Sequence, residues 1–276
     1  MVKGVKVLKK VIFSLIAAAL VGSAVNAMEV QINIEYGKIG SESLLLDIYT
    51  PKAEGAFPAV IIVHGGGWMS GDKRRDITGL FEPIADSNMV CYSINHRLAP
   101  ANRWPAAYDD VRSAVKWVKA NALKYKTDPN RIALAGFSSG AQLAMLAAMK
   151  AYKETDVQAA VGLAAPTDLV AESLRRGDVT TYITGLFGTA VIDSNMVQQL
   201  WDISPINHTR SGMMPVLLVH GTNDNSVPYQ QALNFKKRVE DVGGICGLIT
   251  INGGPHNIAE WSNFDAEYPQ KIVQWL

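Results

Sequence analysis

The stretch RIALAGFSSGAQLA, residues 131–144, is an apolar run that ends on two glycines bracketing a pair of serines. The apolar run predicts a buried strand, and the small-residue segment after it predicts a helix. Glycine weakens a strand, so Gly136 and Gly140 indicate a backbone that bends sharply or approaches a neighbour closely. Between strand and helix, the spacing G-x-S-x-G is that of a nucleophile elbow, which would hold Ser138 out for attack. An ordinary tight turn is the alternative.

The remainder of the chain supplies partners for such a serine, whose hydroxyl needs a base to become nucleophilic. In enzymes with this elbow the chain order is serine, acid, histidine. Of the histidines after Ser138, only His256, in the glycine-rich loop NGGPHNI, leaves room for a plausible acid before it. We prefer Asp224 as that acid, because it follows the strand-like run LLVHG. Asp168, in APTDL, is the rival, and a helix cap or turn is the structural alternative for Asp224.

The glycine run HGGGW, residues 64–68, follows the apolar stretch FPAVIIV. Acyl transfer produces an oxyanion that is best bound by fixed backbone N–H groups, and glycines let the backbone approach it. The run lacks the G-x-x-x-x-G-K-[ST] spacing of a phosphate-binding loop. We therefore predict an oxyanion loop here, with an ordinary loop as the alternative, and we assign Trp68 to substrate binding.

The bulk composition is that of a globular protein: 276 residues, of which 48% are hydrophobic and 18% charged. Residues 1–27 carry four lysines and no acid, then an apolar run and small residues up to Ala27, which predicts a cleaved secretory signal. The run is shorter than the roughly 20 residues of a spanning helix, and an uncleaved anchor is the alternative. We expect export to the periplasm or outside the cell, with no stable membrane association after cleavage.

The remaining chain has 22 basic and 25 acidic residues, a net charge of −3, which gives no indication of a nucleic-acid partner. From residue 28 onward, strand-like and helix-like segments alternate, which predicts a single domain (28–276) with a mostly parallel sheet covered on both faces. An antiparallel pair, VQINIEYG and LLLDIYTP, opens it. Residues 169–213 are expected to form an irregular insertion near the active site. Cys91 and Cys246 lie in strand-like runs and are expected to be buried free thiols.

Together, HGGGWMSGDK, NHRLAP, DPNRIALAGFSSGAQLA, APTDL, DISPI and PVLLVHGTNDNSVP resemble the HGGG-type esterases and lipases of the α/β-hydrolase superfamily. The resemblance is to the bacterial feruloyl-esterase and acetylxylan-esterase-like carboxylesterases related to hormone-sensitive lipase. It implies an α/β-hydrolase fold with an eight-stranded sheet, no cofactor and no metal. It also implies that Ser138 is the nucleophile, Asp224 the acid and His256 the base. The oxyanion-hole amides that it implies are those of Gly66, Gly67 and Ser139.

The resemblance also carries expectations about the substrate. Relatives with cap helices place them before the first strand, whereas here Val30 already begins one, so we expect no N-terminal cap and an open site. Such a site suits short-chain or polysaccharide-linked esters of the acetyl or feruloyl type. The alternatives are an aryl formamidase or other amide hydrolase on the same triad, and a non-catalytic binding protein. The chain departs from its relatives at His96, where they usually carry tyrosine. The implied sheet order separates the two cysteine strands by five positions, beyond disulfide reach.

Overall fold

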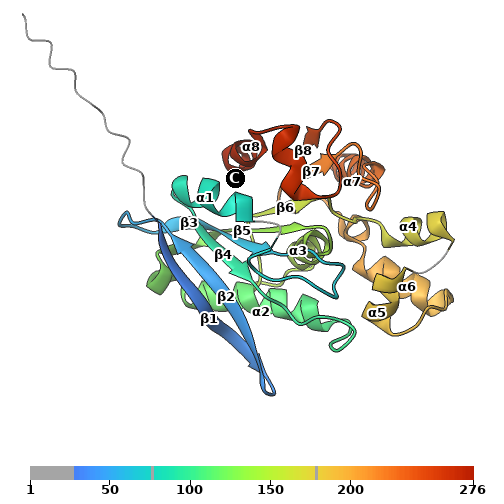
Figure 1. Ribbon diagram of the computed structural model, residues 1–276, viewed down its shortest axis with the longest axis horizontal. Helices are drawn as coiled ribbons and strands as arrows, with labels where there is room; N and C mark the ends of the chain where they lie inside the picture. The colour runs from blue at the N-terminus through green and yellow to red at the C-terminus, as the bar shows by residue number, and fades with distance from the viewer. Residues whose placement is uncertain (1–27, 76–77, 178–179) are drawn as a thin grey trace, which may run out of the picture.

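The computed structural model describes residues 28–75, 78–177 and 180–276. The predicted signal (1–27) and its cleavage lie outside the described residues, as does the question of an N-terminal cap. One eight-stranded sheet runs through the described part in the order β1-β2-β4-β3-β5-β6-β7-β8 (Figure 1). Its strands are β1 (Glu29–Ile39), β2 (Glu42–Thr50), β3 (Phe57–Val63), β4 (Val90–Ile94), β5 (Thr127–Phe137), β6 (Ala159–Leu163), β7 (Val216–Gly221) and β8 (Cys246–Ile251).

The sheet is mostly parallel, as predicted. β1 pairs antiparallel with β2, and β2 with β4, while every pairing from β4 through β3, β5, β6 and β7 to β8 is parallel. The central strands are buried along nearly their whole length because both faces are covered, which explains their continuous apolar runs. Parallel strands end at the same edge of a sheet, so the loops after β3, β5, β7 and β8 gather at one edge.

Helices cover the two faces of the sheet. The core on one face includes side chains of α2, α3 and α7, and the core on the other includes side chains of α1 and α8 (Figure 1). An apolar stripe on α2 faces the first of these cores and is formed by Ala107, Val111, Ala114, Val115 and Val118. The helices are α1 (Phe81–Asp86), α2 (Ala106–Ala120), α3 (Ser139–Met149), α4 (Leu169–Arg176), α5 (Thr181–Phe187), α6 (Ser194–Ile203), α7 (Gln230–Asp241) and α8 (Tyr268–Trp275), with short 3-10 turns η1 (Thr78–Leu80), η2 (Ala122–Tyr125), η3 (Pro205–His208) and η4 (Ile258–Asn263).

The segment 169–213 was expected to be irregular, and this was wrong for most of its length. It contains α4, α5 and α6, which lie together beside the sheet (Figure 1). Side chains cap the start of each of them, and glycines in the left-handed conformation end α4 and α5. The helices have only 7 to 10 residues each, too few turns for a hydrophobic period to stand out from the sequence.

The cysteine prediction is confirmed. Cys91 and Cys246 are both buried and free, and their strands, β4 and β8, stand five positions apart in the sheet. The residues Asp128, Pro129 and Asn130 lie inside β5, where the register against β3 shifts. Within the described ranges, no helix has the length and apolar character needed to cross a membrane.

Candidate active site

The G-x-S-x-G turn has a strained backbone at its serine. Ser138 follows β5 and immediately precedes α3, with φ 53° and ψ −123°, in a region that non-glycine residues rarely adopt. A Cβ on Gly136 would lie within 3.0 Å of the backbone of Gly140, and a Cβ on Gly140 within 3.0 Å of the carbonyl of His64. Real Cβ atoms essentially never approach that closely. Both glycines are therefore required by close backbone packing around the serine. One of the packed partners is the glycine loop 64–68, which is predicted to supply oxyanion-hole amides and is called the oxyanion loop below.

In the folded chain, His256 lies between Ser138 and Asp224 and contacts both side chains. His256 Nε2 lies 3.0 Å from Ser138 Oγ, and its Nδ1 lies 2.7 Å from Asp224 Oδ2. An ionised carboxylate can only accept hydrogen bonds, so Nδ1 carries the proton and Nε2 is left to accept from the serine hydroxyl. The three side chains come from loops after β5, β7 and β8, at the carboxyl edge of the sheet. This is the geometry of a nucleophile, a base and an acid that orients the base.

Asp224 is held from several sides. Its Oδ1 accepts from the backbone amides of Ser226 and Val227 at 2.8 Å each, so the turn considered as its structural alternative is present as well. Buried His220, which donates from Nε2 to the carbonyl of Val227, also lies 3.4 Å from Asp224 Oδ2. Burial acts to raise the pKa of Asp224, but the hydrogen bonds from His220, His256 and Val227 outweigh it and hold the pKa well below its usual range. The acid is therefore ionised wherever the protein is folded near neutral pH.

The glycine loop after β3 offers its backbone to the same site. Gly66 and Gly67 have φ of 115° and 61°, conformations that favour glycine. Among the described residues, no hydrogen-bond acceptor is found for the amides of Gly66 and Gly67, or for that of Ser139 at the start of α3. Free amides at a helix start and in a glycine turn are suited to binding a developing negative charge.

Trp68 supports this loop from inside the protein. Its side chain is 5% exposed, and its indole N–H donates to Gln142 Oε1 at 2.9 Å. Gln142, on α3, in turn donates to the carbonyl of Ile203 at the end of α6, at 2.7 Å. The prediction that Trp68 binds substrate stays a prediction, and the buried indole favours a supporting role. Gln142 was not singled out from the sequence, because nothing local marks a glutamine whose partners are 61 and 74 residues away.

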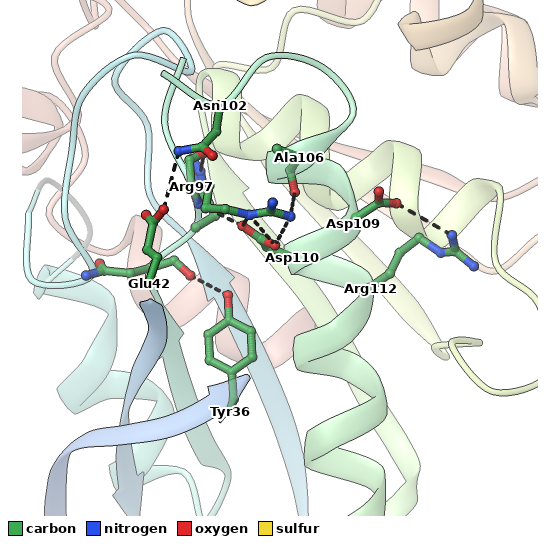
Figure 2. A network of polar contacts seen from close by, with 10 residues as sticks. Tyr36, Glu42, Arg97, Asn102, Ala106, Asp109, Asp110 and Arg112 are labelled. Carbon is green, nitrogen blue, oxygen red and sulfur yellow. Dashed lines mark hydrogen bonds and ion pairs between the residues drawn. The ribbon is translucent and has the colours of Figure 1, made fainter. Parts of the chain in front are cut away.

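The loop after β4 is fixed by a buried ion pair, and Figure 2 shows the contacts around it. The guanidinium of Arg97 donates to both carboxylate oxygens of Asp110 on α2, at 2.7 to 3.0 Å (Figure 2). The Tyr36 hydroxyl donates to the carbonyl of Asn95 at 2.5 Å (Figure 2). Between these anchors, the ring of His96 stacks on that of His64, the first residue of the oxyanion loop, with centroids 4.3 Å apart. This loop is thus a rigid support for the oxyanion loop.

The helices α4 and α5 border the site on two sides. A Cβ on Gly67 would fall within 3.0 Å of the ring of Tyr182 on α5, and one on Gly185 within 3.0 Å of the sulfur of Met69. At the end of α4, Arg176 donates to the carbonyl of Ser226, beside the acid. The insertion therefore contacts the oxyanion loop through α5 and the acid loop through α4.

Asp168, the rival acid, and His208, another histidine that follows Ser138 in the chain, make contacts elsewhere. Asp168 caps α4, accepting from the amide of Ala171 at 2.9 Å, while His208 contacts the carbonyl of Asp202 at 2.8 Å. Across residues 28–75, 78–177 and 180–276, no cluster of three or more His, Cys, Asp or Glu side chains is arranged to hold a metal ion. His220 also contributes to the site through its contact with Asp224, and nothing in the neighbouring sequence signals that contact.

Comparison with known proteins gives concordant results. The chain is 34% identical over 228 residues to the probable carboxylic ester hydrolase LipM of Mycobacterium tuberculosis, covering 76% of this chain and 52% of that protein. It is 31% identical to the esterase LipC of the same organism, covering 77% and 56%. The chain thus spans about half the length of these relatives.

Solved structures resemble the whole described fold. One, described as a truncated carbohydrate esterase from gut microbiota, superposes with a TM-score of 0.78 at 26% identity, covering 92% of this chain and 96% of that one. An esterase of Thermogutta terrifontis, at 24% identity and a TM-score of 0.73 over 91% and 92% of the two chains, supports the fold alone. Residues 46–239 match the family model described as BD-FAE. The chain has the α/β-hydrolase fold predicted from its sequence, and it belongs to the BD-FAE family.

Proposed function

We propose that this protein is a serine carboxylesterase that hydrolyses short-chain carboxylic esters, including acyl groups linked to carbohydrate. The proposal rests on one observation above all: a hydrogen-bond chain runs from Ser138 through His256 to Asp224, next to backbone amides that have no acceptor among the described residues. An ordinary turn has no need of a strained serine placed 3.0 Å from an oriented imidazole.

In the first half of the reaction, Ser138 Oγ attacks the ester carbonyl carbon while its proton passes to His256 Nε2. The carbonyl oxygen becomes an anion and accepts hydrogen bonds from the amides of Gly66, Gly67 and Ser139. His256 then protonates the alcohol oxygen, the bond between that oxygen and the carbonyl carbon breaks, and the alcohol departs. The acyl group remains on Ser138 as an ester. Asp224, ionised throughout, stabilises the imidazolium and keeps Nδ1 protonated.

In the second half, water gives a proton to His256 Nε2 and attacks the acyl carbon, and the same amides hold the oxyanion. When the tetrahedral intermediate collapses, Ser138 Oγ leaves and takes the proton back from His256. The carboxylic acid is released and the resting state is restored. These steps need no group beyond the residues named and water.

The names of relatives support the ester class and suggest the alcohol side. LipM and LipC are named as ester hydrolases, and the gut-microbiota neighbour as a carbohydrate esterase. A second neighbour, at 25% identity, is described as a bifunctional GH43-CE protein of Bacteroides eggerthii, and this chain covers 37% of it. A carbohydrate-linked acyl ester is therefore the substrate class that we propose.

Hydrolysis of p-nitrophenyl acetate by wild type and by the Ser138→Ala variant tests the reaction class. We expect turnover by wild type and a loss of about 10⁴- to 10⁶-fold in kcat for the variant, because no acyl-enzyme can form. A wild-type chain without turnover would contradict the esterase proposal and leave the amide-hydrolase and binding-protein alternatives.

A substrate panel then tests the class of bond. It consists of p-nitrophenyl acetate, butyrate and octanoate, methyl ferulate, acetylated xylan and p-nitroacetanilide as the amide. We expect kcat/KM to be highest for acetate or butyrate and acetate to be released from xylan. An amide hydrolysed faster than the matching ester would favour the amide-hydrolase alternative.

A further inference from the structure

Tyr182 stands at the boundary between the insertion and the oxyanion loop. Its ring occupies the space that a Cβ on Gly67 would need, as described above. The side chain is nonetheless 54% exposed, so one part of the ring packs on the loop and the other is open. No hydrogen bond of its hydroxyl to another described residue is found. An exposed aromatic ring in contact with Gly67 lies within reach of whatever binds at the amide of that residue.

The ring is held by a fixed helix. The amide of Trp104, in the loop after β4, donates to the carbonyl of Leu186 at 3.0 Å, and Met69 packs against Gly185. Leu186 is buried, as is Ile183 on the same helix. Since the loop after β4 is itself clamped by the Arg97–Asp110 pair, α5 is attached to rigid parts of the molecule. Tyr182 is therefore a wall of the site.

The order of the strands indicates which part of a substrate meets this wall. The oxyanion loop follows β3, Ser138 follows β5, and His256 follows β8, so Gly67 and His256 approach the serine from opposite sides of its strand. The leaving alcohol must lie next to His256 Nε2 to receive its proton. The acyl group, on the other side of the reacting carbon, then extends toward Gly67 and Tyr182.

We propose that Tyr182 is a specificity-determining residue that limits the length of the acyl group. This proposal rests on the proposed esterase function and deepens it. The flat ring leaves room for a short acyl group beside the oxyanion hole and blocks the path of a longer chain. A methylene group that does not fit loses binding energy in the transition state. In a hydrophobic pocket, a single methylene group changes kcat/KM by about tenfold or more.

The test compares p-nitrophenyl octanoate with p-nitrophenyl acetate in wild type and three variants. Tyr182→Ala should raise the octanoate-to-acetate ratio of kcat/KM by about tenfold or more, because the wall is removed. Tyr182→Phe, which keeps the ring, should leave the ratio within about twofold of wild type. Tyr182→Trp should lower it. The matched control is Tyr152→Ala, a tyrosine with 67% exposure in the connection between α3 and β6. This control should leave the ratio unchanged.

Each outcome decides the proposal. A raised ratio in the alanine variant, with a thermal midpoint close to that of wild type, supports it. A ratio that stays constant while both substrates slow down together would assign Tyr182 to general positioning and overturn the proposal. A Tyr182→Ala variant with the same kcat/KM as wild type on both substrates overturns the proposal as well. A wild-type chain inactive on every ester overturns the proposed function and this inference with it, whereas an active wild type with an indifferent Tyr182 overturns only the inference.

Discussion

His96 should make the folded protein sensitive to mild acid. Its ring is buried and stacked on His64, and its Nε2 has no hydrogen-bond partner among the described residues. Burial, followed by the neighbouring His64, lowers the pKa of His96 to about 3 in the folded state. In the unfolded chain a histidine has a pKa of about 6.5. The unfolded state therefore binds more protons than the folded state between these two values, and stability falls as the pH falls through that window.

The size of the effect follows from the two pKa values. Between about pH 7.5 and about pH 5, proton uptake by the unfolded state costs the folded state about 2 kcal/mol through His96 alone. Replacing His96 by phenylalanine keeps a ring against His64 and removes the titration, at the cost of the bond from Nδ1 to the carbonyl of Arg97. The variant should lose about 2 kcal/mol less than wild type over the same pH range, whatever its stability at neutral pH.

Urea unfolding at the two pH values, followed by tryptophan fluorescence, measures this difference. His96→Tyr, which places there the residue that related esterases usually carry, serves as a second non-titrating variant and should behave like the phenylalanine variant. The rest of the sequence is identical in all three proteins, so the comparison isolates the contribution of position 96. Equal losses of stability in wild type and both variants would refute the reasoning and mean that His96 is protonated, or hydrated, in the folded state.

Three further predictions concern the elbow and the triad. Ser139→Ala should leave kcat within a few fold of wild type and stability equal or higher, because its buried hydroxyl has no partner in the described structure and only its amide faces the site; a collapse in kcat would show that the hydroxyl is used. Asp224→Asn should reduce kcat by about 10⁴-fold through the wrong tautomer of His256, whereas Asp168→Asn should retain most activity, and comparable losses would contradict the assignment of the acid. Gly140→Ala should destabilise the fold by about 1–3 kcal/mol in urea unfolding, since the clash is with rigid backbone. Gly79→Ala, whose Cβ would meet no described residue within 4 Å, is the matched control.

The sequence predicted the elements with strong local causes and missed those that depend on distant contacts. Ser138 and its two flanking glycines could be recognised because the tight turn requires particular residue types at fixed places in a five-residue segment. The sheet could be predicted because each buried strand is an unbroken apolar run. By contrast, Gln142, His220 and Tyr182 acquire their positions from partners far along the chain.

The same physical reason explains the insertion and Trp68. Helices α4 to α6 are stabilised by caps and by packing on the loops, and neither leaves a pattern of the length that periodicity analysis requires. For Trp68, an aromatic residue after a glycine run has the same local sequence whether it faces a substrate or the core. Only the position of α3 decides that its indole meets Gln142.

The bridge made by Gln142 has a consequence for anyone who wishes to redesign this protein. One amide side chain on α3 joins Trp68 of the oxyanion loop to the last residue of α6. Exchanging the insertion for that of a related fold would also exchange the carbonyl that holds Gln142. A transplanted segment must therefore bring a backbone acceptor to the position now filled by Ile203. Otherwise the graft alters the glycine loop 64–68 together with the insertion, and the effects of the two changes on the proposed reaction become inseparable.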